Sequence, residues 1–275
     1  MRKKRIENFE RFQKEEKENN KLERLLREQV NNLRKVGVPV NENLRIDMKK
    51  FKDILSEERV NEDIKTLKEV KRNQYKRELT LEEIEKIEKE RKGEKGEIFV
   101  CLLLQKFLGD NFLVLRTSLY DDRVNKVDLF VVNKKTGNID FTIDVSVNPP
   151  FSLSLFEKQK RLLERNTSSG TLLTYGIKFE KGKAQPSSYV KYLPLFSINL
   201  PPRILEKGIN SITSLKEKAP QEKAIFDRFK TQIEEQINQI KEKCFTENKR
   251  PHPNLERKLT QVEELIKWEL SLNLE

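Results

Sequence analysis

Two aspartates interrupt a pair of apolar segments, where charged side chains are uncommon. Asp128 lies in KVDLFVV and Asp144 lies in FTIDVSV, and a turn containing Gly137 joins the two segments. The apolar residues predict strands that pair as a hairpin. The question is what chemistry requires a carboxylate inside each strand.

The register of this hairpin follows from its hydrophobic pattern. A three-residue loop at 135–137, with its glycine in the left-handed conformation, pairs Lys134 with Asn138 and puts Asp128 opposite Asp144. One face of the hairpin is then apolar, whereas a slip by one residue would mix apolar and polar residues on both faces. A two-residue Thr-Gly loop is the poorer alternative, because a type I′ turn prefers Asn or Asp first. In the favoured register the two aspartate Cβ atoms lie roughly 4.5–5.5 Å apart.

Two carboxylates at this distance repel each other unless one is protonated or a cation lies between them. Oxygen ligands of this kind suit Mg²⁺ or Mn²⁺. The alternative is that both aspartates face solvent, but Phe130 and Val132 on the same face indicate that it is partly covered. With one histidine and two distant cysteines, the chain lacks the parts of a zinc site or a serine or cysteine triad. Hydrolytic chemistry would have to use carboxylates, lysines and a hard metal ion.

The composition favours an anionic partner. The formal net charge is +11, and we expect a nucleic acid, with DNA preferred; the alternative is that the positive excess serves solubility. The basic start MRKKR is not followed by an apolar segment, and no window approaches 18 apolar residues. We therefore expect no membrane partner and a cytoplasmic location, where both cysteines stay reduced.

The elements around the aspartates predict a mixed α/β core. The segment 98–108 is apolar almost all round, which predicts a buried helix ended by Gly109. Strands are expected at 112–116, 127–132 and 139–147, a helix at 155–165, a strand at 171–179, a Gly/Pro/Ser-rich loop, a strand at 195–199, and a helix from Pro201 to about 215. This order favours a mixed sheet flanked by helices.

Helical extensions are expected at both ends of this core. Residues 1–80 form a predicted helical extension, which either makes a coiled coil or lies on the core, and Thr80 with Glu83 is a capping-box signature for the next helix. The predicted core spans 81–215. Residues 216–275 carry two apolar stripes separated by NKRPHPN, which predicts a helical hairpin.

These motifs and their order resemble the PD-(D/E)XK nuclease superfamily. Its first acid lies on the initial helix, as Glu97 does in KGE, and its second starts the middle strand, as Asp128 does in KVDLFVV. Its third lies in the next strand, as Asp144 does in TIDVS. The resemblance covers about 92–215 and implies a restriction-endonuclease-like fold.

The resemblance also implies a function and a metal site. The family hydrolyses phosphodiester bonds of nucleic acids, and one or two Mg²⁺ or Mn²⁺ ions would be held by Asp128, Asp144 and the carbonyl of Val145. Glu97 would contribute directly or through a water molecule. The family's third motif ends in a lysine, and the corresponding residue in this chain is Ser146.

Three lysines could replace the one missing at Ser146. Some family members supply this lysine from the following helix, where Lys160 and Lys158 lie, and the hairpin register places Lys126 across from Ser146. If Phe156 faces the sheet, the stem of Lys160 runs along apolar surface. We therefore rank Lys160 first, Lys158 second and Lys126 third.

Two other functions remain open. Without a lysine at the site, the chain would be a catalytically inactive, nuclease-fold protein that binds DNA or RNA through phosphate contacts. Alternatively, the long terminal helices would make it an assembly or scaffold protein, with a homo-oligomer formed through those helices.

Overall fold

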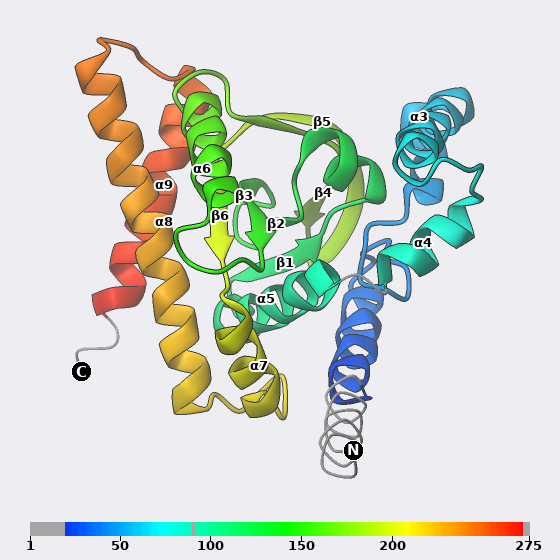
Figure 1. The fold of residues 1–275 in the computed structure, drawn as a ribbon, viewed down its shortest axis with the longest axis horizontal. Helices are drawn as coiled ribbons and strands as arrows, with labels where there is room; N and C mark the ends of the chain where they lie inside the picture. Colours follow the sequence, from blue (N-terminus) through cyan, green and yellow to red (C-terminus); the bar gives the residue numbers. More distant parts are fainter. Residues whose placement is uncertain (1–19, 90–91, 272–275) are drawn as a thin grey trace, which may run out of the picture.

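A four-stranded mixed sheet lies at the centre of the molecule (Figure 1). The computed structural model describes residues 20–89 and 92–271. The strand order is β1–β2–β3–β6, with antiparallel pairs except for the parallel pair β3–β6. The bounds are β1 Phe112–Arg116, β2 Leu129–Asn133, β3 Ile139–Ser146 and β6 Leu195–Asn199. The predicted mixed α/β class is confirmed.

Helices cover this sheet. α5 (Lys92–Leu108) runs along β1 and β3, and every residue from Ile98 to Leu104 is buried, as the apolar segment predicted. α6 (Leu153–Asn166) and α8 (Pro220–Thr246) pack against β6 (Figure 1). Because α5 is apolar on most sides, both the sheet and the neighbouring helices exclude water from it.

The central hairpin has the predicted register over its apolar pairs. Leu129 pairs with Ile143, and Val131 pairs with Phe141. All four side chains are buried. Burial of this apolar face fixes the register, because a slip of β3 by one residue would put its other face, which includes Asp140 and Asp144, in place of the apolar side chains.

The turn of this hairpin differs from the prediction. The Asn133 amide, rather than that of Lys134, donates to the Asn138 carbonyl at 2.9 Å, and a bulge just before Val132 absorbs the extra residue. Gly137 has the expected left-handed conformation, with φ +73°. A Cβ atom on Gly137 would lie 2.2 Å from a backbone oxygen, so the close packing of the turn also requires glycine.

A second, two-stranded sheet is inserted between α6 and β6. It consists of β4 (Thr171–Glu180) and β5 (Lys183–Leu193). β5 was expected to be a loop, because its sequence KAQPSSYVKYL contains proline and several small polar residues. Pro186 is tolerated because β5 has β4 as its strand partner in the described structure and lies at a sheet edge.

The N-terminal region is more broken than predicted. Residues 20–35 are helical and bury Leu25, Val30 and Leu33 in the main core, whereas residues 1–19 of the predicted extension lie outside the described ranges. Further along the predicted extension, the helical part is divided into the 3₁₀ turn η1 (Met48–Phe51), α2 (Lys52–Leu55) and α3 (Glu57–Tyr75). α4 (Leu81–Lys89) begins with the predicted capping box, in which the Thr80 amide donates to Glu83 Oε2 at 2.7 Å.

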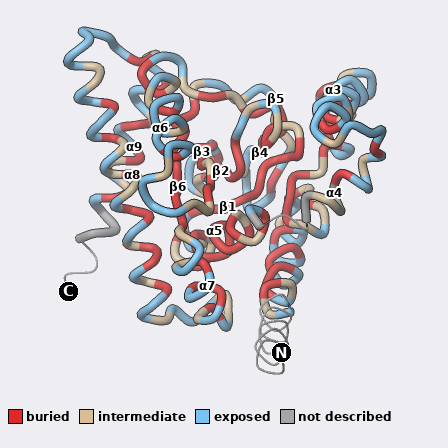
Figure 2. The backbone as a smooth tube through the Cα atoms, in the orientation of Figure 1, coloured by how far each residue is buried: buried red, intermediate tan, exposed pale blue. Residues whose placement is uncertain are grey.

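The C-terminal hairpin is confirmed. α7 (Pro202–Ser211) leads to α8, and α9 (Pro253–Ser271) returns beside α8 (Figure 1). Lys106 of α5 and Glu222 of α8 form a fully buried ion pair of 2.6 Å. Residues from all three predicted ranges contribute to one continuous hydrophobic core, visible as the buried segments of Figure 2.

The contact between α5 and α7 gives a first testable prediction. A Cβ atom on Gly208 would lie 2.3 Å from the Phe99 ring, which is fully buried and cannot move aside. Gly208→Ala should therefore lower the free energy of unfolding by about 1–3 kcal/mol, measured by urea titration. Gly93→Ala is the matched control, because a Cβ there meets nothing within 4 Å. Equal stabilities of the two variants would contradict this packing.

Candidate functional site

An open cavity of about 770 Å³ lies where α5, α6 and the central hairpin meet. Its lining combines carboxylates with cationic side chains. The charged lining residues are Glu97, Asp122, Arg123, Lys126, Asp128, Asp144, Lys158, Arg161, Glu164 and Arg165. Such a mixture at one place in the fold can bind both cations and anions.

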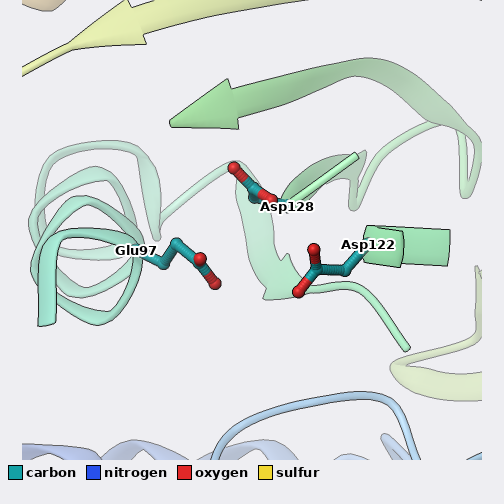
Figure 3. Close-up of side chains that lie close together, drawn as sticks. All are labelled: Glu97, Asp122 and Asp128. Atoms are coloured by element: carbon teal, nitrogen blue, oxygen red, sulfur yellow. The ribbon is translucent and has the colours of Figure 1, made fainter. Parts of the chain in front are cut away.

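Three carboxylates form the acidic cluster of this cavity. Glu97 comes from α5, Asp122 from the π-helical turn η2 (Asp121–Asn125), and Asp128 from the residue before β2 (Figure 3). One oxygen of each lies within 4.8 Å of the others. The structure thus brings the predicted Glu97 and Asp128 together and adds Asp122, which the sequence analysis missed.

Asp128 is held by the neighbouring strand. Its Oδ2 accepts a hydrogen bond from the Val145 amide at 2.6 Å, and its own amide donates to the Ile143 carbonyl at 3.0 Å. Burial raises the pKa of the Asp128 carboxyl well above its usual range, and the negative charges of Glu97 and Asp144 raise it further. The repulsion predicted between Asp128 and Asp144 is therefore present.

Asp144 is paired with a lysine. Lys158 Nζ lies 2.6 Å from Asp144 Oδ1 and donates to the Val145 carbonyl at 3.3 Å. These are two of the oxygens assigned to the metal by the family resemblance. In the described structure an ammonium group binds them, whereas the acidic cluster gathers around Asp128.

The expectation that Phe156 faces the sheet is wrong. Leu155 and Leu162 are buried, but Phe156 is 68% exposed, so the helix is rotated relative to the face expected to pack on the sheet. Lys158 consequently points into the cavity, while Lys160 is exposed and is not part of the cavity lining. The structure therefore places Lys158 in the cavity and Lys160 outside it, which reverses the predicted ranking of these two lysines.

Lys126, the third candidate lysine, and Ser146, which stands at the position of the motif lysine, have different surroundings. Lys126 lines the cavity and ends η2 in the left-handed conformation, with φ +59°. Ser146 is buried, and its hydroxyl donates to Asn199 Oδ1 at 3.3 Å. Ser146 thus interacts with β6.

Two buried arginines, Arg45 and Arg116, bind carboxylates at and beside the acidic cluster. Arg45 lies 2.8 Å from Glu97 Oε2 and 3.0 Å from Glu94 Oε2, and Arg116 lies 2.6 Å from each of the same two carboxylates. Arg45 Nη1 is also 2.9 Å from Asp122 Oδ2, although the angles do not form a hydrogen bond. We call these residues, with Glu94, Glu97 and Asp122, the arginine–carboxylate network.

The network sets the charge states of its acids. Burial alone would raise the pKa of Glu94, but the guanidinium groups of Arg116 and Arg45 outweigh burial and hold this pKa at about 2. For Asp122 the balance is reversed: burial raises the pKa to about 6 despite Arg45, and Glu97 adds to the rise. Negative charge at Asp122 is therefore only partly compensated.

Asp121 fixes the turn that carries Asp122. Its carboxylate accepts hydrogen bonds from the amides of Thr174 and Tyr175 at 2.8 and 3.0 Å, and from Asn125 Nδ2 at 2.6 Å. The turn is thereby bound to β4. The adjacent aspartates in YDDRVN were the available sequence signal for Asp122, but two acids in a turn are common at a protein surface.

The network generates a pH-dependent stability prediction. The pKa of Glu94, about 2 in the folded protein, lies below its value in the unfolded chain. The stability that the ionised Glu94 contributes to the fold is therefore complete above about pH 4.3 and is lost as the pH falls towards 2. Glu94→Gln should lower the free energy of unfolding by roughly 3–5 kcal/mol at neutral pH, because two buried guanidinium groups lose a charged partner. In urea titrations, the difference in the free energy of unfolding between this variant and the wild type should become smaller below about pH 4.3.

The exposed Glu157 provides the control for this measurement. Glu157→Gln should show no such pH-dependent difference. A Glu94→Gln effect that stays constant down to acidic pH would mean that the ion pairs with Arg45 and Arg116 do not stabilise the fold.

Comparisons with known proteins give no relative to guide the interpretation of this cavity. Within residues 20–89 and 92–271, no helix is long and apolar enough to cross a membrane. No family model matches the chain, and neither the curated proteins nor the solved structures include a match. The interpretation of the site therefore depends on its own geometry.

Proposed function

We propose that this protein is a metal-dependent nuclease that hydrolyses phosphodiester bonds of a nucleic acid. The observation that carries the proposal is the meeting of Glu97, Asp122 and Asp128 in one cavity with the Asp144–Lys158 pair. Carboxylates for a metal and a cation for a phosphate are the groups that this reaction needs.

The order of elements supports the resemblance to the PD-(D/E)XK superfamily. α5 precedes three antiparallel strands, α6 follows them, and β6 then pairs in parallel with β3. Glu97 on α5, Asp128 beside β2 and Asp144 on β3 occupy the elements that the resemblance assigns to the family's acids. The hairpin β4–β5 is an insertion between α6 and β6 relative to that pattern.

The charges of the site fit a hard divalent cation. Five carboxylates, those of Glu94, Glu97, Asp122, Asp128 and Asp144, meet four cationic side chains, those of Arg45, Arg116, Arg123 and Lys158. Among these five, only the Asp128 carboxylate makes no ion pair with a described residue. Asp122 Oδ2 makes no hydrogen bond with any described residue. Buried carboxylate oxygens that lack such partners suit Mg²⁺ or Mn²⁺.

Each residue then has a defined task. Asp128, Asp122 and Glu97 would hold the metal ion, which when bound lowers the pKa of water and stabilises charge on a phosphate. Lys158 would neutralise negative charge that develops on the scissile phosphate, since its ammonium lies at the edge of the acidic cluster. Asp144 orients Lys158 by the 2.6 Å ion pair.

One observation favours the alternative of a nucleic-acid-binding protein without turnover. Ser146, which replaces the family's lysine, is buried against Asn199 and carries no charge. Calorimetry separates the two functions. Absence of Mg²⁺ and Mn²⁺ affinity, together with salt-sensitive nucleic-acid binding, would support the binding protein.

Asp128→Asn tests the metal site directly. The substitution keeps the oxygen that accepts from the Val145 amide and removes the carboxyl group that makes no ion pair with a described residue. We expect Mg²⁺-dependent cleavage of plasmid and single-stranded substrates to fall below detection, and calorimetric Mn²⁺ affinity to disappear. The thermal unfolding temperature should not decrease, which shows that the fold is intact. Cleavage that persists in this variant would place the activity elsewhere.

Lys158→Met and Lys160→Met test the source of the positive charge. Both substitutions keep the stem of the side chain, and the two lysines lie on the same helix, but only Lys158 lines the cavity. Lys158→Met should lower kcat by about 10²–10³-fold, whereas Lys160→Met should not change it. Equal effects of the two substitutions would exclude Lys158 from the reaction.

A further inference from the structure

Two cationic side chains of the cavity have no polar partner among the described residues. Lys126 follows η2 and Arg161 lies on α6, and both side chains are exposed. Neither makes a side-chain hydrogen bond or an ion pair with any residue that the structure describes. By contrast, Lys158 is paired with Asp144, and Arg165 donates to the Asn125 carbonyl at 3.0 Å.

Arg161 lies on the face of α6 that lines the cavity. Lys158, Arg161 and Arg165 are spaced at i, i+3 and i+7, so they lie along one face of the helix, and all three line the cavity. Arg165 links this face to η2 through its bond to Asn125. A row of cations therefore leads from the acidic cluster to the turn that carries Lys126.

The acidic cluster itself is recessed. Asp128 is 7% exposed and Asp122 is 4% exposed, so a phosphate reaches them only from inside the cavity. The cavity has a volume of about 770 Å³ and is open to solvent. In a duplex, base pairing holds each backbone on a fixed helical path, whereas a single strand can bend so that one phosphate enters the recess. One strand, with its bases free to turn away, is therefore the form of nucleic acid that the recess favours.

We propose that the cavity takes a single nucleic-acid strand or an unpaired end, and that Arg161 and Lys126 bind phosphates next to the scissile one. This inference rests on the proposed nuclease function for the position of the scissile phosphate. The two cations contribute affinity for a polynucleotide, because each contact with a phosphate releases a counterion from the strand. They take no part in the chemical step.

The test measures binding and cleavage separately. Fluorescence anisotropy with Ca²⁺ in place of Mg²⁺ compares a labelled single strand, a blunt duplex of the same sequence, and a duplex with an unpaired tail. The variants are Arg161→Gln and Lys126→Gln, with Lys160→Gln as the control on the same helix. Steady-state cleavage of the single strand in Mg²⁺ gives kcat and KM.

We expect the single strand and the tailed duplex to bind at least tenfold more tightly than the blunt duplex. Each of the two variants should weaken single-strand binding about threefold to tenfold and reduce the slope of log K against log salt by about 0.7. KM should rise with kcat unchanged, and Lys160→Gln should behave as the wild type.

The outcomes separate this inference from the proposed function. Tight blunt-duplex binding, or single-strand binding that is unaffected by Arg161→Gln and Lys126→Gln, would overturn the inference even if cleavage occurs. Single-strand binding that depends on both residues, without cleavage by the wild type in Mg²⁺, would support the strand site and overturn the nuclease. A fall in kcat alone in either variant would contradict a role restricted to binding.

Discussion

The arginine–carboxylate network is the interaction on which the rest of the site depends. Arg45 and Arg116 are buried and lie close together, which is tolerable only because Glu94 and Glu97 bind both of them. The Ile46 amide also donates to the Arg116 carbonyl at 3.2 Å. The network therefore joins the N-terminal segment, α5 and β1 at one point. Since Glu97 faces the cavity from this point, the fold positions the site through buried charge.

Asp128 and Asp122, in contrast, lower the stability of the fold when they are ionised, because burial raises the pKa of both carboxyls. Buried ion pairs contribute little net stability, because desolvation offsets the attraction between the charges. In this protein the Asp128 carboxylate makes no ion pair with a described residue, and its pKa is raised well above its usual range. Hydrophobic packing of α5 against the sheet must hold these acids together. A strained group of like charges that packing maintains is typical of a functional site.

Sequence reasoning succeeded where burial alone decides the structure. The strands β1 and β6, the buried helix α5 and the register of Leu129 with Ile143 follow from apolar patterns. Sequence reasoning failed where contacts between residues far apart in the sequence decide the structure. The rotation of α6 depends on how that helix packs on β6. The contribution of Arg45 to the site depends on the path of a segment fifty residues away from Glu97, which no local pattern encodes.

The positive charge beside Asp144 comes from Lys158 of α6 and not from β3. Ser146 lies two residues beyond Asp144 and so on the same face of β3, at the position of the motif lysine in the superfamily that the sequence resembles. Ser146 is buried there, and its hydroxyl donates to Asn199 Oδ1 of β6 at 3.3 Å. The charge instead reaches the same region from α6, with Lys158 Nζ 2.6 Å from Asp144. Because Lys158 neutralises Asp144, the metal ion that we propose would lie towards Asp128, Asp122 and Glu97, where the Asp128 carboxylate makes no ion pair with a described residue.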